Sequence, residues 1–163
     1  MIRIIAVGKM KDRRLAELLA NYGERIRSMA PFAIVEIRDA KPEREAKDMI
    51  RRLGSEAGRE LVVTMDERGK EMTSRGLAEL LGRYGSIAFL VGGADGLDDA
   101  VHDRADRRVR LSALTLTHEM ARVLLAEQIY RGSLVYDPVQ SHVRIDFYTA
   151  AATGSMTARI KDE

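Results

Sequence analysis

Short apolar runs alternate with amphipathic segments along most of this chain. Four runs are rich in β-branched and aliphatic side chains, which is typical of buried strands. They cover residues 2–7, 33–37, 61–65 and 87–91, and a weaker fifth run covers residues 109–111. Because the runs are apolar throughout and do not alternate with polar residues, they indicate a mostly parallel sheet covered on both faces.

The segments between these runs carry apolar residues at helical spacing, so each predicts a helix with one apolar stripe. Three such segments lie around residues 15–26, 46–53 and 77–84, and a longer one runs from about His118 to Tyr130. The alternation of strands and helices predicts one α/β domain over residues 1–136, with helices on both faces of the sheet. Residues 137–163 form a divergent C-terminal tail, which we expect to be loosely ordered.

Turn and capping residues support these boundaries. Pro31 and Pro42 lie between predicted elements, and Thr73 or Ser74 can cap the third helix. Gly54 and Gly58 are placed to end the second helix.

Composition narrows the class of protein. The chain has 163 residues, of which 45% are hydrophobic, so one domain with a sizeable core is expected. It contains no cysteine, which excludes disulfides, thiolate zinc sites and thiol nucleophiles and favours a cytoplasmic location. We find no signal peptide and no apolar stretch approaching about 20 residues, so we expect no membrane partner.

The charge pattern permits a nucleic-acid partner without requiring one. The formal net charge is only +2, but the pI is about 9.0 and most of the cations are arginines. Local basic patches can therefore exist on a nearly neutral chain, and the planar guanidinium group suits phosphate.

A pair of glycines follows the fourth apolar run, in the segment Leu-Val-Gly-Gly-Ala-Asp-Gly-Leu at residues 90–97. Gly92 and Gly93 allow a sharp turn and a close approach of a ligand at the carboxyl end of a strand, where ligands bind in open α/β sheets. Taken alone, the pair is equally compatible with a plain turn. The segment matches neither the dinucleotide-binding fingerprint nor the P-loop, which argues against hydride transfer and NTP hydrolysis.

A second candidate segment, rich in hydroxyl groups, covers residues 111–118 and leads into the last helix. Its backbone and small side chains suit recognition of an adenine and a ribose. The alternative is an ordinary strand followed by a helix that Thr117 caps. Asp66, Glu67 and Gly69 form a third candidate element at the same rim, or a simple surface turn.

Other catalytic signatures are weak. The three histidines, His102, His118 and His142, do not approach the spacing of metal ligands, so we expect no metal site. Arg122 and Arg131 on the last helix are expected to be exposed or ion-paired.

Four ordered segments together resemble the large-subunit (23S) rRNA pseudouridine-N3 methyltransferase family, which belongs to the SPOUT (α/β-knot) superfamily. They lie at residues 4–11, 63–70, 89–97 and 111–131. The resemblance implies a C-terminal trefoil knot, a homodimer, S-adenosylmethionine as cofactor, and 23S rRNA within the ribosome as partner. Carried over by motif, the implied cofactor contacts are Met65, Gly92, Gly93, Leu111, Ser112, Ala113, Leu114, Thr115 and Leu116.

The implied reaction also suggests catalytic candidates. A sulfonium methyl group is a strong electrophile, so the enzyme mainly has to align it with N3 of the base and help remove the N3 proton. We take His118 as a pocket residue and His142 as a proton acceptor. Arg122 or Arg131 would stabilise a phosphate or the base anion.

The chain departs from the family pattern in two places. Thr117 replaces a usual proline, and residues 140–143 replace the usual Pro-Tyr-His-basic sequence, of which only His142 survives. An alternative function is therefore a catalytically idle RNA-binding dimer of the same fold. A flavodoxin-like small-ligand module is a third interpretation, which rests on the α/β pattern alone.

Overall fold

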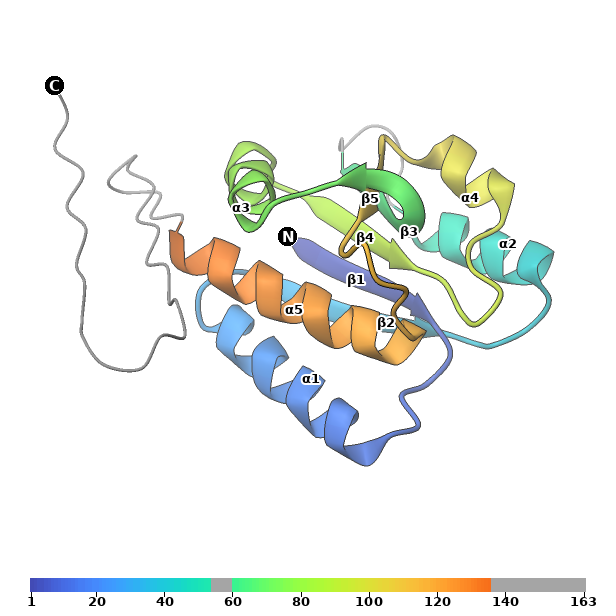
Figure 1. Cartoon of the computed structure of the whole chain (residues 1–163), viewed down its shortest axis with the longest axis horizontal. Coiled ribbons are helices and arrows are strands. Elements are labelled where there is room, and N and C mark those ends of the chain that lie inside the picture. The colour runs from blue at the N-terminus through green and yellow to red at the C-terminus, as the bar shows by residue number, and fades with distance from the viewer. Residues whose placement is uncertain (54–59, 136–163) are drawn as a thin grey trace, which may run out of the picture.

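Five parallel strands form the centre of the computed structural model, which describes residues 1–53 and 60–135 (Figure 1). The sheet order is β2-β1-β4-β3-β5, and every neighbouring pair is parallel. The sequence predicted a mostly parallel sheet but no strand order. The strands are β1 (Ile2–Val7), β2 (Phe32–Ile37), β3 (Leu61–Glu71), β4 (Ile87–Val91) and β5 (Arg107–Arg110).

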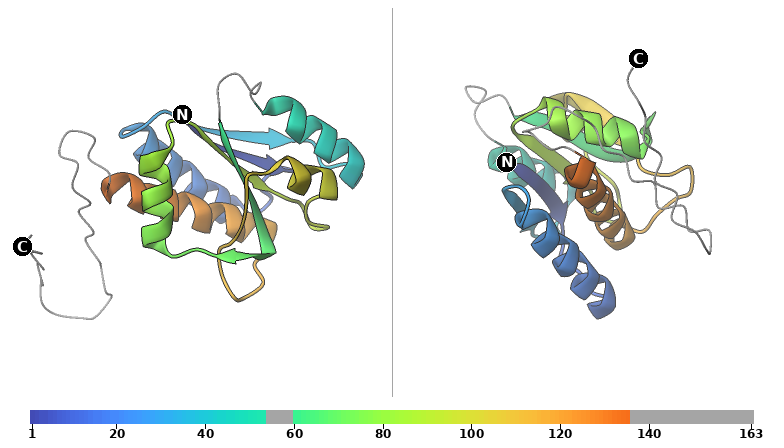
Figure 2. Two further views of the ribbon diagram at one scale, coloured as in Figure 1. Left: turned by 90° about the horizontal axis from the view of Figure 1, so that it is seen from above. Right: turned by 90° about the vertical axis from the view of Figure 1, so that its left-hand side faces the viewer.

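Helices cover both faces of this sheet (Figures 1 and 2). One face carries α1 (Arg13–Arg27), α3 (Ser74–Arg83) and α5 (His118–Val135), and α5 packs against both of the other helices. The opposite face carries α2 (Pro42–Arg52) and the short α4 (Asp99–Arg104), which contact each other. This arrangement confirms the predicted α/β class.

The two helical layers explain why the strands are apolar throughout. Successive side chains of a strand point to opposite faces of a sheet. In β1, Ile4 and Ala6 join the core under α1 and α5, whereas Ile5 and Val7 join the core under α2 and α4. All four side chains are 0–2% exposed, so no position of this stretch is left for a polar residue.

Hydroxyl and carboxylate side chains cap the first turns of α1, α3 and α5. Asp12 precedes α1 and accepts hydrogen bonds from the amides of Arg14 and Leu15. Thr73 Oγ1 accepts from an amide in the first turn of α3, which confirms one of the two predicted caps. Thr117 Oγ1 accepts from the amide of Met120 at 3.3 Å, as the capping interpretation of this residue predicts.

β3 is longer than its apolar run, and here the sequence prediction was incomplete. The strand continues to Glu71, and its register with β5 shifts so that both Met65 and Lys70 pair with Val109. Asp66, Glu67 and Gly69 therefore belong to an irregular stretch of strand and not to a separate surface turn. The extension carries charged residues that face solvent, so it lacks the apolar signal of a buried strand.

Two further differences lie nearby. The six-residue helix α4 was not predicted, because it is too short to show a helical period. β5 spans residues 107–110, not 109–111, and only Val109 among its side chains is buried.

Some expectations lie outside the described residues. These are the end of the second helix at Gly54 and Gly58, and the tail at residues 137–163. The trefoil knot stays a prediction. In the described part of the chain, no helix is long and apolar enough to cross a membrane.

Candidate functional site

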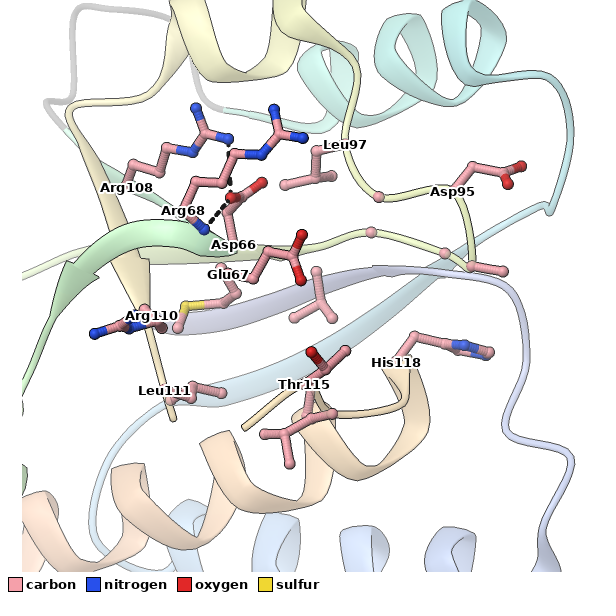
Figure 3. A pocket seen from close by; sticks show the side chains of 18 of the residues that line it. Asp66, Glu67, Arg68, Asp95, Leu97, Arg108, Arg110, Leu111, Thr115 and His118 are labelled. Carbon is pink, nitrogen blue, oxygen red and sulfur yellow. Dashed lines mark hydrogen bonds and ion pairs between the residues drawn. The ribbon is translucent and has the colours of Figure 1, made fainter. Parts of the chain in front are cut away.

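A cavity of about 380 Å³ lies at the carboxyl ends of β4 and β5 and beside residues 65–68 of β3 (Figure 3). This volume is within the range of small-molecule sites. The glycine turn after β4 and the loop that leads into α5 form two of its walls, so the two segments singled out in the sequence face one another across it. Eight of the nine expected cofactor contacts line the cavity: Met65, Gly92, Gly93, Leu111, Ser112, Leu114, Thr115 and Leu116.

The turn after β4 needs its glycines. A Cβ atom on Gly92 would lie 2.6 Å from the carbonyl carbon and oxygen of Gly96, far inside van der Waals contact. Gly96 itself has a φ of 82°, which disfavours other residues, and its amide donates to the carbonyl of Gly93 at 3.2 Å. A Cβ on Gly93 would lie 3.1 Å from Val7 Cγ1, so this turn packs directly on the end of β1.

The loop before α5 supplies both hydroxyl and apolar groups. Ser112 Oγ accepts a hydrogen bond from the amide of Leu114 at 2.9 Å, which fixes a local turn. Leu114 is 76% exposed although it lines the cavity, so a bound ligand would cover apolar surface that water now touches. Ala113, the ninth expected contact, does not line the cavity.

A charged cluster forms the wall on the β3 side. Asp66 lies 2.8 Å from the guanidinium of Arg108 and 3.2 Å from His102 Nε2, and it accepts the amide of Arg68 at 2.7 Å. Burial acts to raise the pKa of Asp66, but the hydrogen bonds from Arg68 and Arg108 outweigh it and hold that pKa below its usual value. The Nδ1 atom of His102 lies 3.3 Å from Thr64 Oγ1, so both ring nitrogens have partners.

This cluster was only partly visible in the sequence. Asp66 was a candidate for the rim, but His102 and Arg108 were not considered as lining residues. His102 lies on the unpredicted helix α4, and Arg108 looks like ordinary surface charge in the sequence. Asp95 and Leu97 also line the cavity, and they belong to the glycine-containing segment already singled out.

The lining fits the expected cofactor chemically. Met65, Leu97 and Leu111 offer apolar surface for an adenine, and the hydroxyl groups of Ser112 and Thr115 suit a ribose. Carboxylates also line the cavity, so they can face the positive charges of a sulfonium and an α-amino group. They belong to Asp66, Glu67, Asp95 and Asp99.

His118 lines the cavity at the first residue of α5. Its imidazole ring points away from Thr115 and from the arginine side chains (Figure 3). Its Nε2 atom lies 3.9 Å from a carboxylate oxygen of Glu119, at the outer limit of an ion pair.

Arg122 lies elsewhere: of the two predicted states, exposed or ion-paired, it is ion-paired and not exposed. Its side chain is completely buried, and it donates hydrogen bonds to the backbone carbonyls of Val7 and Gly8, the latter at 2.9 Å. A carboxylate oxygen of Glu36 is 3.7 Å away. Desolvation lowers the pKa of Arg122, against the opposing charges of Glu36 and Glu119. Stabilisation of a phosphate by Arg122 would require it to leave these carbonyl groups.

The other two catalytic candidates are not part of the cavity that the structure describes. Arg131 is exposed on α5 and forms an ion pair with Glu127 one turn earlier in the same helix. His142 lies outside the described residues.

Glu119, which the sequence did not single out, connects α5 to the beginning of α1. Its two carboxylate oxygens accept the amides of Lys11 and Asp12 at 2.9 and 3.0 Å. These two hydrogen bonds lower the pKa of Glu119, with further help from His118 and Arg122. The beginning of α5 therefore holds the end of β1 and the segment after it, through the guanidinium of Arg122 and the carboxylate of Glu119.

Comparison with known proteins places this arrangement in context. Residues 1–140 match the family model described as "Predicted SPOUT methyltransferase". The ribosomal RNA large subunit methyltransferase H of Synechococcus sp. (strain RCC307) is 42% identical over 136 residues, covering 82% of this chain and 88% of that protein. The protein of the same name from Nitratidesulfovibrio vulgaris is 43% identical over 144 residues, covering 82% and 93%.

Solved structures share the fold at low sequence identity. A probable methylase family protein from Haemophilus influenzae aligns with a TM-score of 0.54 at 16% identity, over 82% of this chain and 66% of that one, just under two thirds of its length. A probable methyltransferase from Bordetella pertussis aligns with a TM-score of 0.50 at 15% identity, over 81% and 93%.

Proposed function

Because this chain belongs to the SPOUT methyltransferase family, we propose that it transfers the methyl group of S-adenosylmethionine to N3 of a pseudouridine in 23S ribosomal RNA. Relatives that are 42% and 43% identical are named ribosomal RNA large subunit methyltransferase H. The single observation that carries the proposal is that the glycine turn and the loop before α5 line one cavity. A homodimer that acts on the ribosome in the cytoplasm belongs to the same proposal.

The cavity residues would hold the cofactor in two ways. Gly92 and Gly93 let the backbone approach closely, while Leu111 and Leu116 cover the apolar ring from the other wall. When bound, S-adenosylmethionine supplies a methyl group on a positively charged sulfur, which is already a strong electrophile. The chain's own residues then have to orient the target base, exclude water and remove the N3 proton.

His118 is the better placed of the two lining histidines for work on the substrate. His102 is held by Asp66 and Thr64, whereas the contact of His118 within residues 1–53 and 60–135 is a 3.9 Å approach to Glu119. In this proposal His118 contacts the base and His142 accepts the N3 proton. Arg131, exposed on α5, would contact a phosphate.

The His118 assignment can be separated from a purely structural role. We expect His118→Asn to lower kcat by about 10²-fold or more, while the affinity for S-adenosylhomocysteine changes little. A loss of S-adenosylhomocysteine affinity without a change in kcat would contradict a role on the base.

Mass spectrometry of 23S rRNA from cells with and without this gene tests substrate and activity together. We expect one methyl group on one pseudouridine to disappear with the gene. Ribosomes purified from the deletion strain should then accept labelled methyl groups from the purified protein. If the protein binds these ribosomes without transferring label, it is the catalytically idle dimer instead.

A further inference from the structure

Cations gather at the edge of the sheet next to the candidate site. β5 is the last strand in the sheet order, and three of its four residues are arginines. A second cavity, of about 660 Å³, lies along this edge. We call it the edge groove and define it by four lining cations: Arg68, Lys70, Arg107 and Arg108.

The irregular register of β3 creates the groove. Lys70 pairs with the same residue, Val109, that pairs with Met65, so the intervening stretch of β3 bulges beside β5. Gly69 makes this possible, because a Cβ atom there would lie 2.5 Å from the backbone carbonyl carbon of Val109. Arg68 and Lys70, on either side of Gly69, thereby line the same groove as the arginines of β5.

The free charge of the groove is positive. Arg68, Lys70 and Arg107 are exposed and form no ion pair with the residues that the structure describes. The fourth cation, Arg108, is already paired with Asp66 at 2.8 Å.

Both carboxylates that line the groove are already engaged. Glu71 pairs with Arg110 at 3.4 Å, and Asp106 accepts the amide of Val62 at 2.8 Å. Arg68, Lys70 and Arg107 are therefore left with donors for an external anion, whereas Arg108 is paired with Asp66.

The groove and the candidate site are neighbours. Arg68 and Arg108 line both cavities, and their side chains lie side by side at one wall of the site (Figure 3). A polyanion lying in the groove would pass directly beside the space proposed for the cofactor.

We propose that the edge groove binds the sugar-phosphate backbone of the RNA beside the target nucleotide. This inference rests on the proposed function and adds the surface by which the substrate is held. Arginine forks match phosphate oxygens, and contacts to phosphates fix the position of a nucleic acid without reading its sequence. Anchored in the groove, the backbone leaves one base free to enter the adjoining cavity.

The test neutralises two groove cations that do not line the candidate site. In Lys70→Ala/Arg107→Ala, the wall formed by Arg68 and Arg108 stays intact. The matched control is Arg44→Ala/Lys47→Ala, which removes two exposed cations from α2 that also lack ion pairs with described residues. Binding to ribosomes that lack the methyl mark is measured at several salt concentrations, and S-adenosylhomocysteine affinity is measured by calorimetry.

We expect the groove variant to bind ribosomes roughly tenfold or more weakly and its salt dependence, the slope of log K against log salt, to fall by about 1 to 2. Its S-adenosylhomocysteine affinity should stay within about twofold of the original protein. The control should match the original protein in both measurements.

Other outcomes separate the failure of this inference from the failure of the proposed function. If the original protein methylates ribosomes and the groove variant shows the same affinity and salt slope, the groove does not bind RNA. The arginines would then serve to keep an unpaired strand edge from associating with other chains, and light scattering of the variant would detect that association. If the original protein neither binds ribosomes nor methylates them, the proposed function fails, and this inference fails with it.

Discussion

Arg122 donates a hydrogen bond of 2.9 Å to the carbonyl oxygen of Gly8, 114 positions earlier in the chain. A second hydrogen bond goes to the carbonyl of Val7. The side chain of Val7 lies against Gly93, since its Cγ1 atom would be 3.1 Å from a Cβ atom added there. A buried guanidinium group is costly unless it is paired and hydrogen-bonded. Arg122 therefore fixes the end of β1, which in turn supports the glycine turn from behind.

Replacing Arg122 tests this support. Arg122→Met removes the hydrogen bonds that the buried carbonyl of Val7 and the partly buried carbonyl of Gly8 accept, so we expect the free energy of unfolding to fall by about 2 to 4 kcal/mol. Arg131→Met, on the exposed side of the same helix, should cost less than about 0.5 kcal/mol because its ion pair is exposed. Urea denaturation of both variants measures the difference. Equal losses would show that the hydrogen bonds of Arg122 contribute no more to the free energy of unfolding than the exposed ion pair of Arg131 does.

The glycine turn makes a prediction about binding. Gly92→Ala forces a Cβ atom against the backbone of Gly96, so the turn that lines the cavity must change shape. We expect S-adenosylhomocysteine affinity to fall by at least about tenfold, or about 1.4 kcal/mol. Gly85→Ala is the control, since an added Cβ there meets nothing within 4 Å. The turn would not form the ligand wall if both variants bound with the original affinity in calorimetry.

Leu114 should matter for the ligand and not for the fold. Because its side chain is largely exposed, Leu114→Ala should change the free energy of unfolding by less than about 0.5 kcal/mol. A ligand that covers the side chain would lose roughly tenfold in affinity, as expected for part of a leucine's apolar surface. Leu134→Ala removes another exposed leucine, 55% exposed and distant in sequence from the cavity segments, and should leave both quantities unchanged. Loss of stability in Leu114→Ala would indicate a structural role instead.

Glu119 gives a prediction about pH. Its pKa in the folded protein is lowered, so its stabilising contribution is present above its ordinary value of about 4.5 and is lost as the pH falls through the lowered value. Glu119→Gln should therefore be less stable than the original protein at pH 7, and the gap should narrow in acid. Glu17→Gln, at an exposed ion pair with Arg13, is the control and should show little change at either pH. Denaturation curves at pH 7 and pH 3.5 measure both gaps, and a gap for Glu119→Gln that stays constant would contradict the assignment.

Elements buried on both faces were predictable from sequence. The runs that became β1, β2 and β4 were found almost to the residue, because helices cover both faces of the sheet and most positions in these strands are apolar and at least partly buried. The outer half of β3 was missed because most of its residues are charged, and Glu67, Arg68, Lys70 and Glu71 face solvent. That the glycine turn and the loop before α5 line the same cavity could also be predicted. Ligands bind at the carboxyl ends of the strands in open parallel sheets, and the family resemblance placed cofactor contacts in both segments.

The parts of the site that sequence reasoning missed depend on distant partners. Nothing around Arg122 distinguishes it from Arg131, because the carbonyl groups that hold it come from the first ten residues. Likewise, His102 becomes a site residue only because α4 places it 3.2 Å from Asp66, on a different strand. Such contacts have no local period or motif and appear only when the chain is folded.

The hydrogen bonds of Glu119 to Lys11 and Asp12 join a segment that is synthesised early to a helix that is synthesised much later. They span 108 and 107 positions, and the loop that closes the cavity precedes Glu119 by only a few residues. During synthesis the strands β1 to β4 leave the ribosome long before α5 does. Until α5 has been made, the loop that closes the cavity has no attachment to the segment after β1, so the pocket cannot be complete while only β1 to β4 have left the ribosome.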